Sequence, residues 1–411
     1  MAKINPFKPN SPVSPGMFAG RVKEIEAIEK GFFQAKNGHP THFLITGERG
    51  IGKSSLIEFV TNVSKGEISS YEHGKFNFVT ISISISDRMG LVSFIRLIDR
   101  HIKREIGKIE KVRSFLESTW DFVQRIKIMD SGIEGRTTSD DPDLVIDDFS
   151  YSLSETCKRI TNIEEDDIKD GIIFFIDEAD NANLNLGLGY FIKTVTESLT
   201  KQGCNRVMFV LAGLPEVNDK LSASHQSSLR IFTELKIKEL SVSDRHYVID
   251  RGMEQGNTIN TEATTVSSDA KGLLSSLSEG YPHFIQQFAF SAFEHNNDGE
   301  ISEEDVLDGA FNEGGALDAI GKRYYESNYF DQIKSDEYRQ VLGIMAGNMN
   351  NWITKKEIAE KFSGSSQTLT NALQALTTRK IILRNQSTKG EYRLQQKGFA
   401  LWIKLFGNRT K

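Results

Sequence analysis

Short apolar runs alternate with amphipathic stretches through the first 240 residues of the chain. The runs have the length of single β-strands, and we place strands at 42–46, 76–85, 172–176, 207–212 and 234–240. Apolar residues recur at helical spacing between them, at 22–33, 53–64, 91–130 and 144–161. Strands that alternate with helices in this way predict an α/β fold, with a mostly parallel sheet covered on both faces.

The pattern beyond residue 240 is helical as far as about residue 314. In segment 333–411 the spacing of apolar residues predicts helices at 336–346, 354–362 and 366–378. Short strands at 381–384 and 391–394 follow them. Thr354 and Glu357 have the spacing of a capping box at the start of the second helix. This order resembles a winged helix-turn-helix. We therefore divide the chain into an α/β core at 1–240, a helical lid at 241–314 and a winged-helix domain at 333–411.

The overall composition is that of a soluble globular protein. Hydrophobic residues make up 38% of the chain and charged residues 26%. No apolar run approaches the roughly 20 residues that a membrane-spanning helix needs, and the N-terminus lacks the apolar stretch of a signal peptide. The two cysteines, Cys157 and Cys204, lie far apart in the sequence and lack the spacing of metal ligands. These features predict a cytoplasmic location.

Charge is distributed unevenly along the chain. The net charge is −6, but residues 333–411 hold 14 Lys or Arg against 5 Asp or Glu and carry +9, which leaves −15 for the remainder. Such asymmetry favours an anionic partner, such as DNA, for the winged-helix domain. A basic, solvated surface without a partner remains the alternative.

A phosphate-binding loop lies between the first predicted strand and the helix after it. The sequence Gly47-Glu48-Arg49-Gly50-Ile51-Gly52-Lys53-Ser54 matches the pattern G-x-x-x-x-G-K-[ST] in the strand–loop–helix context that the motif requires. Its glycines let successive backbone N–H groups surround phosphate oxygens, and the helix N-terminus adds partial positive charge. Lys53 should reach the β- and γ-phosphates, and the Ser54 hydroxyl should ligate Mg²⁺. We include Ser55 among the residues expected to bind ATP or ADP.

A second acidic motif follows the strand at 172–176. Asp177 and Glu178 place adjacent carboxylates at the carboxyl end of this strand, where α/β proteins bind ligands. We expect Asp177 to hold Mg²⁺, through water, and Glu178 to polarise the attacking water as a general base. The alternative is a pair of acids that caps the next helix.

The two motifs together resemble Walker A and Walker B of the AAA+ ATPases, and within them the initiator, STAND and transposition ATPases. Phe18-Ala19-Gly20-Arg21 with Glu24 resembles the F-x-G-R-x-x-E box that these families carry before the phosphate-binding loop. The resemblance covers about residues 8–310. It implies an ATP-driven switch in which Phe18, Gly20 and Arg21 line the adenine pocket. A simple turn before a helix is the alternative for this box.

Three positions depart from the AAA+ pattern. The fourth strand ends in Ala212-Gly213, where relatives place a polar sensor residue. Pro282 and His283 resemble the start of the lid helix that supplies the second sensor, with His283 in place of the usual arginine; a core or surface histidine is the alternative. Arg230 precedes the fifth strand, where relatives present an arginine finger to the neighbouring subunit, and a local salt bridge is the alternative.

The third helix of the winged-helix domain carries polar side chains on one face. If the domain binds DNA, Gln367 and Asn371 would face base edges in the major groove. Basic side chains around the predicted wing would neutralise phosphates, namely Arg379, Lys380, Arg384, Lys389 and Arg393. Winged helices also serve as protein-docking modules, and this alternative stays open.

Three functions are compatible with these patterns. The first is an ATPase that assembles through subunit interfaces and acts as a nucleotide-driven switch on or near DNA. The second is a STAND-like signalling or defence ATPase whose winged helix makes protein contacts. The third is an ATP-binding module that hydrolyses ATP poorly. Salt-dependent DNA affinity separates the first from the second, and a turnover assay separates both from the third.

Overall fold

The computed structural model describes residues 3–11, 18–70, 72–107, 110–124, 141–162, 168–333, 335–348, 351–379, 381–385 and 388–407. The chain divides into two compact units, Arg21–Lys238 and a second made of Met1–Gly20 with Glu239–Lys411. The first twenty residues therefore group with the helical half of the chain, although the sequence pattern placed them with the α/β core. The boundary between lid and winged helix stays a prediction, because both lie within the second unit.

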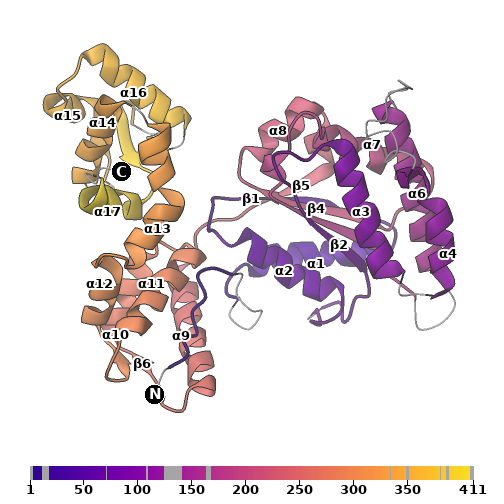
Figure 1. Cartoon of the computed structure of the whole chain (residues 1–411), viewed down its shortest axis with the longest axis horizontal. Helices are drawn as coiled ribbons and strands as arrows, with labels where there is room; N and C mark the ends of the chain where they lie inside the picture. The colour runs from indigo at the N-terminus through magenta and orange to yellow at the C-terminus, as the bar shows by residue number, and fades with distance from the viewer. Residues whose placement is uncertain are drawn as a thin grey trace. The chain divides into compact units, whose positions relative to one another are not determined.

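The unit Arg21–Lys238 is built on a five-stranded parallel sheet (Figure 1). Its strands run in the order β2-β3-β4-β1-β5. Their bounds are β1 (His42–Thr46), β2 (Val79–Ser84), β3 (Ile172–Asp177), β4 (Val207–Gly213) and β5 (Phe232–Lys236). Because all neighbours are parallel, the carboxyl ends of the strands meet at one edge of the sheet. The predicted α/β fold with a parallel sheet is thereby confirmed.

Helices cover both faces of this sheet. Successive strand residues point to opposite sides, so neighbouring residues of β3 contact different layers of helices. On one side Phe32 of α1 (Val22–Lys36) meets Phe175 with 6.4 Å between ring centroids, and α2 (Lys53–Ser64) follows the phosphate-binding loop. On the other side Phe174 stacks on Phe209 at 4.9 Å, in a core shared with the short helix α8 (Val217–Ser224) and with four longer helices. These are α3 (Leu91–Ile106), α4 (Glu110–Thr119), α6 (Pro142–Thr161) and α7 (Leu188–Lys201). The shorter elements η2 (Ala179–Asn181), α8 (Val217–Ser224) and η3 (Ser228–Ile231) complete the unit.

Some predicted bounds differ from the observed ones. The fifth strand was expected at 234–240 but spans Phe232–Lys236, and Ile237 N makes a last bond to Thr46 O at 2.7 Å before the chain leaves the sheet. The stretch 91–130, expected to be helical throughout, breaks at Gly107 between α3 and α4, and residues 125–130 lie outside the described residues. The region after residue 240 also contains two paired strands of two residues each, β6 (Thr265–Val266) and β7 (Glu300–Ile301).

Five helices and the N-terminal segment form the first part of the second unit (Figure 1). The helices are α9 (Val242–Ile259), α10 (Ser268–Leu277), α11 (Pro282–His295), α12 (Glu303–Phe311) and α13 (Ala316–Tyr324). Phe7 is buried against α9 where Gly252 has no side chain, and Asn5 Nδ2 donates to Phe290 O of α11 at 3.0 Å. These contacts explain why the N-terminal segment groups with the helical unit.

The winged-helix elements follow at the C-terminus of the same unit. They are α14 (Asp336–Gly347), β8 (Ile353–Thr354), α15 (Lys355–Lys361), α16 (Ser366–Thr378), β9 (Ile382–Arg384), β10 (Glu391–Leu394) and α17 (Lys397–Phe406). The predicted capping box is present, since Glu357 N donates to Thr354 Oγ1 at 3.2 Å and Thr354 N donates to Glu357 Oε2 at 2.8 Å. The order β8-β10-β9 forms a small antiparallel sheet. The strand β8 and the helix α17 were not predicted.

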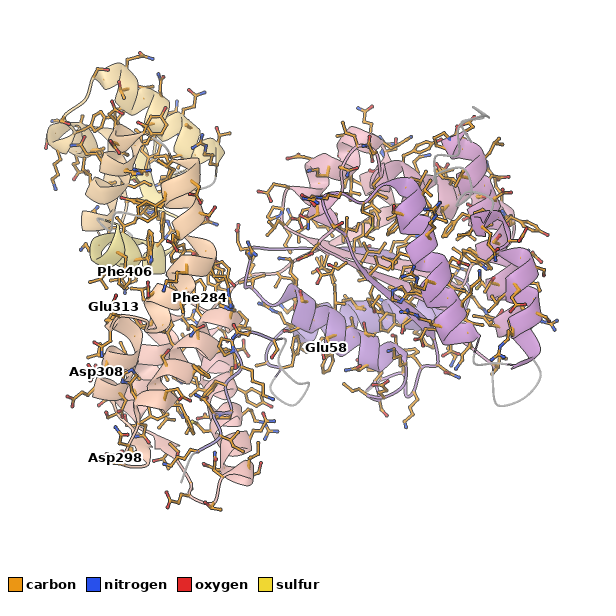
Figure 2. The ribbon with its side chains drawn as sticks, in the orientation of Figure 1. Glu58, Phe284, Asp298, Asp308, Glu313 and Phe406 are labelled. Atoms are coloured by element: carbon orange, nitrogen blue, oxygen red, sulfur yellow. The ribbon has the colours of Figure 1, made fainter. Side chains whose placement is uncertain are left out.

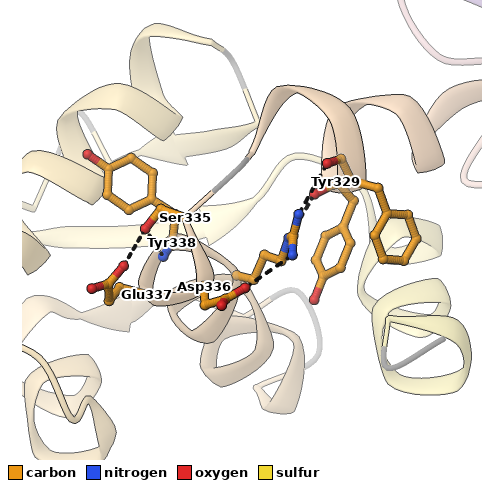
Figure 3. A network of polar contacts seen from close by, with 7 residues as sticks. Tyr329, Ser335, Asp336, Glu337 and Tyr338 are labelled. Carbon is orange, nitrogen blue, oxygen red and sulfur yellow. Dashed lines mark hydrogen bonds and ion pairs between the residues drawn. The ribbon is translucent and has the colours of Figure 1, made fainter. Parts of the chain in front are cut away.

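A π-helical turn, η4 (Ser327–Gln332), connects α13 to the first winged-helix helix, and Figure 3 shows the polar contacts there. Ser335 caps α14 by accepting from Tyr338 N, and its hydroxyl also donates to Glu337 at 2.6 Å. The Arg339 guanidinium donates to Tyr329 O at 3.2 Å and to Asp336 Oδ1 at 3.1 Å. This arginine therefore fixes the start of α14 on the preceding turn.

Aromatic rings connect the lid helices to the winged helix within this unit. Figure 2 labels the two ends of the series, Phe284 in α11 and Phe406 in α17. The rings in order are Phe284, Tyr324, Tyr325, Trp402 and Phe406, with neighbouring centroids 5.5, 6.5, 6.1 and 6.4 Å apart.

None of the helices among the described residues has both the length and the apolar character needed to cross a bilayer.

One core histidine makes the stability of the sheet depend on pH. His42 Nδ1 accepts a hydrogen bond from Phe209 N at 3.0 Å, and burial lowers the pKa of His42 to about 4. The His42 imidazole takes up a proton near pH 6.5 in the unfolded chain but only near pH 4 in the folded chain. Stability conferred by the neutral ring is therefore present above pH 6.5 and lost as pH falls, by about 3 kcal/mol at pH 4.

We expect His42→Gln to reduce this dependence in urea unfolding between pH 7 and pH 4, because glutamine does not titrate. The matched control is His39→Gln, which removes an exposed histidine and should keep the wild-type dependence. An unchanged dependence in His42→Gln would show that another group causes it.

Candidate functional site

The phosphate-binding loop lies between β1 and α2, as predicted. Gly50 and Gly52 have φ angles of 79° and 100°, which glycine adopts at little cost because it has no Cβ. A Cβ on Gly47 would lie 2.9 Å from Ile51 Cγ2 and 3.0 Å from Ile237 O. The three glycines of the motif are therefore each required by the conformation of the loop.

The Lys53 ammonium lies inside this loop. Its Nζ donates to Gly47 O at 2.8 Å and to Glu48 O at 3.0 Å. Burial lowers the pKa of Lys53, while the nearby Asp177 and Asp180 carboxylates act in the opposite direction. Ser54 and Ser55 follow in the first turn of α2. The structure thus places the motif's cation between the loop carbonyls and the acids at and just after the end of β3.

The predicted magnesium ligands are in contact with each other. Ser54 Oγ donates to Asp177 Oδ2 at 2.7 Å, which joins the start of α2 to the end of β3. Among the described residues, no three His, Cys, Asp or Glu side chains gather into a metal site. One hydroxyl and one carboxylate nevertheless fit Mg²⁺, because this ion takes few protein ligands and keeps water and phosphate oxygens.

Glu178 has an unusual backbone conformation for a residue with a side chain. Its φ and ψ are 54° and 35°, in the left-handed region, where non-glycine residues are uncommon and often functional. Its side chain makes no capping bond to η2, so the capping alternative finds no support for Glu178. Instead, its Oε2 accepts from Ser84 Oγ at 2.9 Å, at the end of the neighbouring strand β2.

The end of β4 shows why a small residue stands at the sensor position. Asp180 Oδ1 accepts from Leu214 N at 2.8 Å, and a Cβ on Gly213 would lie 2.8 Å from the same oxygen. Asp180 therefore occupies the space beside β4 and also acts electrostatically on Lys53. No sequence pattern indicated a role for Asp180 or for Ser84. The only signal for Asp180 was its place two residues after Glu178.

The residues expected around the adenine fall in both units. Arg21 precedes α1, has a φ of 66°, and donates through Nη2 to Ile51 O at 3.1 Å, so it contacts the phosphate-binding loop directly. Phe18 and Gly20 group instead with the helical unit, as do Pro282 and His283 at the start of α11. A role for these four residues at the nucleotide stays a prediction.

His283 has an arginine partner that no sequence motif indicated. Its Nε2 lies 2.6 Å from Arg323 Nη1, and because arginine only donates hydrogen bonds, this ring nitrogen is the acceptor. Arg323 also donates to Pro9 O at 3.3 Å and to Asn10 Oδ1 at 2.6 Å. The permanent positive charge at this position is therefore that of Arg323 in α13, and the predicted sensor role of His283 stays untested.

Arg230 lies in η3, directly before β5, with an exposed side chain. None of the ion pairs formed among the described residues involves its guanidinium. The local salt bridge therefore finds no support in the part of the chain that the structure describes. An arginine finger stays a prediction.

The third winged-helix helix, α16, has the two faces expected from its sequence. Leu369 and Leu373 are buried, while Gln367 and Asn371 are exposed and joined by a hydrogen bond of 3.1 Å. Of the basic side chains expected to neutralise phosphates, Arg379, Arg384 and Lys389 are exposed. Arg393 is half-buried instead, with its guanidinium 5.1 Å from the centre of the Trp352 ring, and Lys380 lies outside the described residues.

No protein-family model matches the sequence, and no curated protein is similar enough to match it. Solved structures do match. The ORC2 protein of Aeropyrum pernix in its ADPNP–ADP complexes is 14% identical, with 99% of this chain and 97% of that chain covered and a TM-score of 0.58. The ADP form of the same protein is 15% identical, with 98% and 96% covered and a TM-score of 0.51. At these identities the likeness shows the fold alone. It confirms the AAA+ fold that the sequence predicts.

Proposed function

We propose that this chain, which has the AAA+ fold, is a cytoplasmic ATPase that acts as a nucleotide-driven switch on or near DNA and assembles through subunit interfaces. The observation that carries the proposal is the meeting of Lys53, Ser54 and Asp177 at the carboxyl edge of the sheet, with Ser54 Oγ 2.7 Å from Asp177 Oδ2. The structurally similar ORC2 protein was solved with ADPNP and ADP, which supports a nucleotide as ligand. Both cysteines are free thiols, which fits the reducing cytoplasm.

We assign the hydrolytic roles by position. Lys53 and the N–H groups of the loop bind the β- and γ-phosphates, and Ser54 and Asp177 hold Mg²⁺, which neutralises phosphate charge when bound. Glu178, at the end of β3, orients the attacking water and accepts its proton. The bond from Ser84 keeps the Glu178 carboxylate at the end of β2, so water must compete with this hydroxyl for the carboxylate.

DNA is the partner that we propose for the winged-helix domain. The domain carries +9 in a chain whose remainder carries −15, so attraction to phosphates is concentrated in this segment. Gln367 and Asn371 are exposed on α16 at the positions from which a recognition helix reads bases, and Lys389 is exposed in the wing.

Two variants separate phosphate contacts from base contacts. Lys389→Ala should weaken binding to every duplex similarly, and Asn371→Ala should change the preference among sequences. With about six phosphate contacts, log affinity should fall against log salt with a slope near −5, and Lys389→Ala should reduce this slope by about one. The measurement is fluorescence anisotropy of the full-length protein with ATP on nonspecific duplexes.

The matched control for this experiment is Lys404→Ala, which removes the same charge from an exposed position of α17. It should leave the salt dependence nearly unchanged. If the wild-type protein binds no duplex at low salt, with or without ATP, the DNA proposal fails.

A STAND-like switch with a protein-docking winged helix is the second candidate. One observation favours it: Trp352 is 40% exposed and packs beside the Arg393 guanidinium. Tryptophan and arginine dominate the binding energy of many protein–protein interfaces. Under this alternative Trp352→Ala abolishes a protein contact and Lys389→Ala has no effect on function.

A further inference from the structure

The N-terminal segment 3–10 runs along the helices of its own unit, beside α9 and α11 (Figure 1). Its residues adopt neither helix nor strand, so its contacts with these helices hold it in place. Towards its end the segment reaches α13, where the Arg323 guanidinium donates to Asn10 Oδ1 at 2.6 Å. We call residues 3–10 the strap. The strap site is the surface that it covers, formed by Gly252, Gly256, Asn260, Gln286, Phe290 and Glu294.

Two amide side chains of the strap site bind the backbone of the strap. Asn260 Oδ1 accepts from Ile4 N at 2.7 Å, and Asn260 Nδ2 donates to Ile4 O at 2.9 Å, so one side chain satisfies both backbone groups of one residue. Further along, Lys8 N donates to Gln286 Oε1 at 2.9 Å, and Gln286 is 2% exposed. Main-chain hydrogen bonds of this kind supply affinity for an extended peptide.

Two glycines of α9 make room for the apolar side chains of the strap. Phe7 is 2% exposed and lies against Gly252, where a Cβ would overlap its ring. One turn further along α9, a Cβ on Gly256 would lie 2.9 Å from Pro6 Cγ. Residues four apart share one face of a helix, so the two glycines form one continuous surface for Pro6 and Phe7.

The side chain before this pair is read by hydrogen bonds. Asn5 Nδ2 donates to Phe290 O at 3.0 Å and to Glu294 Oε1 at 2.7 Å, while Asn5 Oδ1 accepts from Phe7 N at 3.1 Å. An ionised aspartate has no donor and could not make the first two bonds. The strap site therefore selects an asparagine followed by proline and an aromatic ring.

We propose that the strap site is a peptide-binding site that recognises Asn5-Pro6-Phe7 in an extended backbone, and that the strap of a second copy of the chain can occupy it in place of the chain's own. Exchange of an identical segment between copies is a low-cost route to assembly, because the same contacts form in both arrangements. Within one chain the tethered strap has the advantage of a high effective concentration. Neither ATP nor DNA takes part in these contacts, so the inference is independent of the proposed function.

The first test adds a fluorescent synthetic peptide of residues 1–11 to the full-length Phe7→Ala protein, whose own strap lacks the buried ring. We expect fluorescence anisotropy to show binding. Wild-type protein should bind the peptide at least about tenfold more weakly, because its own strap competes from a tethered position. If Phe7→Ala protein fails to fold, Asn5→Ala protein, whose strap lacks the bonds to Phe290 and Glu294, takes its place.

Two peptide variants test how the site recognises its ligand. A peptide with Phe7→Ala should bind at least about 30-fold more weakly than the wild-type peptide, the loss typical of a buried aromatic anchor. The matched control is a peptide with Ile4→Ala, which also shortens an apolar side chain. It should keep its affinity, because the Ile4 side chain is 56% exposed and its bonds to Asn260 are made by its backbone.

The second test mixes two full-length proteins and measures their masses by native mass spectrometry. Phe7→Ala protein keeps an intact strap site, and Gly252→Leu protein keeps an intact strap but has a blocked site. We expect a heterodimer in the mixture. The control partner carries both substitutions and should form none, which distinguishes strap exchange from assembly through other subunit interfaces. If Gly252→Leu impairs folding, Asn260→Ala replaces it, because it removes both bonds to the Ile4 backbone.

Three results would overturn the proposal. The first is a folded protein with a weakened strap that does not bind the wild-type peptide. The second is equal affinity for the wild-type peptide and the peptide with Phe7→Ala. The third is a mixture that contains no more heterodimer than the control pair.

Discussion

Glu178→Gln is expected to slow ATP hydrolysis by about 10²–10⁴ while nucleotide binding persists. Glutamine keeps the length and shape of the side chain but cannot accept the proton of the attacking water. The strained backbone of Glu178, with φ 54°, and its bond of 2.9 Å from Ser84 show that the chain holds this carboxylate in a defined place. Steady-state phosphate release gives the rate, and calorimetry gives the ATP affinity.

A matched control tests whether the effect is specific. Glu58, labelled in Figure 2, exposes its carboxylate on α2, so Glu58→Gln removes the same charge without touching the end of β3. It should turn over ATP at the wild-type rate. Wild-type turnover in Glu178→Gln itself would remove Glu178 from the proposed mechanism.

Arg230→Ala is expected to lower turnover by about 10³–10⁵ if its guanidinium completes the site of a neighbouring subunit, as arginine fingers do in related phosphoryl transfer. Its exposure in η3 and its absence from the ion pairs among the described residues leave it available for such a role. Mixing Arg230→Ala with Glu178→Gln protein should restore part of the activity, because some mixed interfaces contain both intact residues.

The control for this experiment is Arg104→Ala, which removes an exposed arginine from α3 and should leave turnover unchanged. Full activity in Arg230→Ala would exclude the residue from the site. Lost activity without recovery in the mixture would place its action within its own subunit.

The sequence predicted the core elements well where a strong local signal fixed them. β1 was predicted as observed, because five buried residues lead directly into a glycine-rich loop, and α16 was predicted as observed, because its apolar residues recur at helical spacing. The predicted end of β5 was wrong, because apolar residues continue in the sequence beyond the last residue of the observed strand. β6 and β7 were missed, since two-residue strands leave no periodic signal.

The candidate site was predictable in part for the same reason. Lys53, Ser54 and Asp177 belong to motifs whose spacing reflects their chemistry, and the structure brings them together. Ser84, Asp180 and Arg323 were not predicted, because their roles arise from contacts between segments distant in sequence. Ser84 meets Glu178 only because β2 is the neighbour of β3, and the hydrophobic pattern does not specify the order of parallel strands.

The most direct test of the central claim is a calorimetric titration of the full-length protein with ATP and Mg²⁺, with wild type and Lys53→Ala side by side. The phosphate-binding loop encloses the Lys53 ammonium, with Nζ 2.8 Å from Gly47 O. We predict that wild type binds nucleotide and that Lys53→Ala shows no measurable binding, although both unfold at similar urea concentrations. Equal ATP affinity in the two proteins would contradict the assignment of this loop as the nucleotide site.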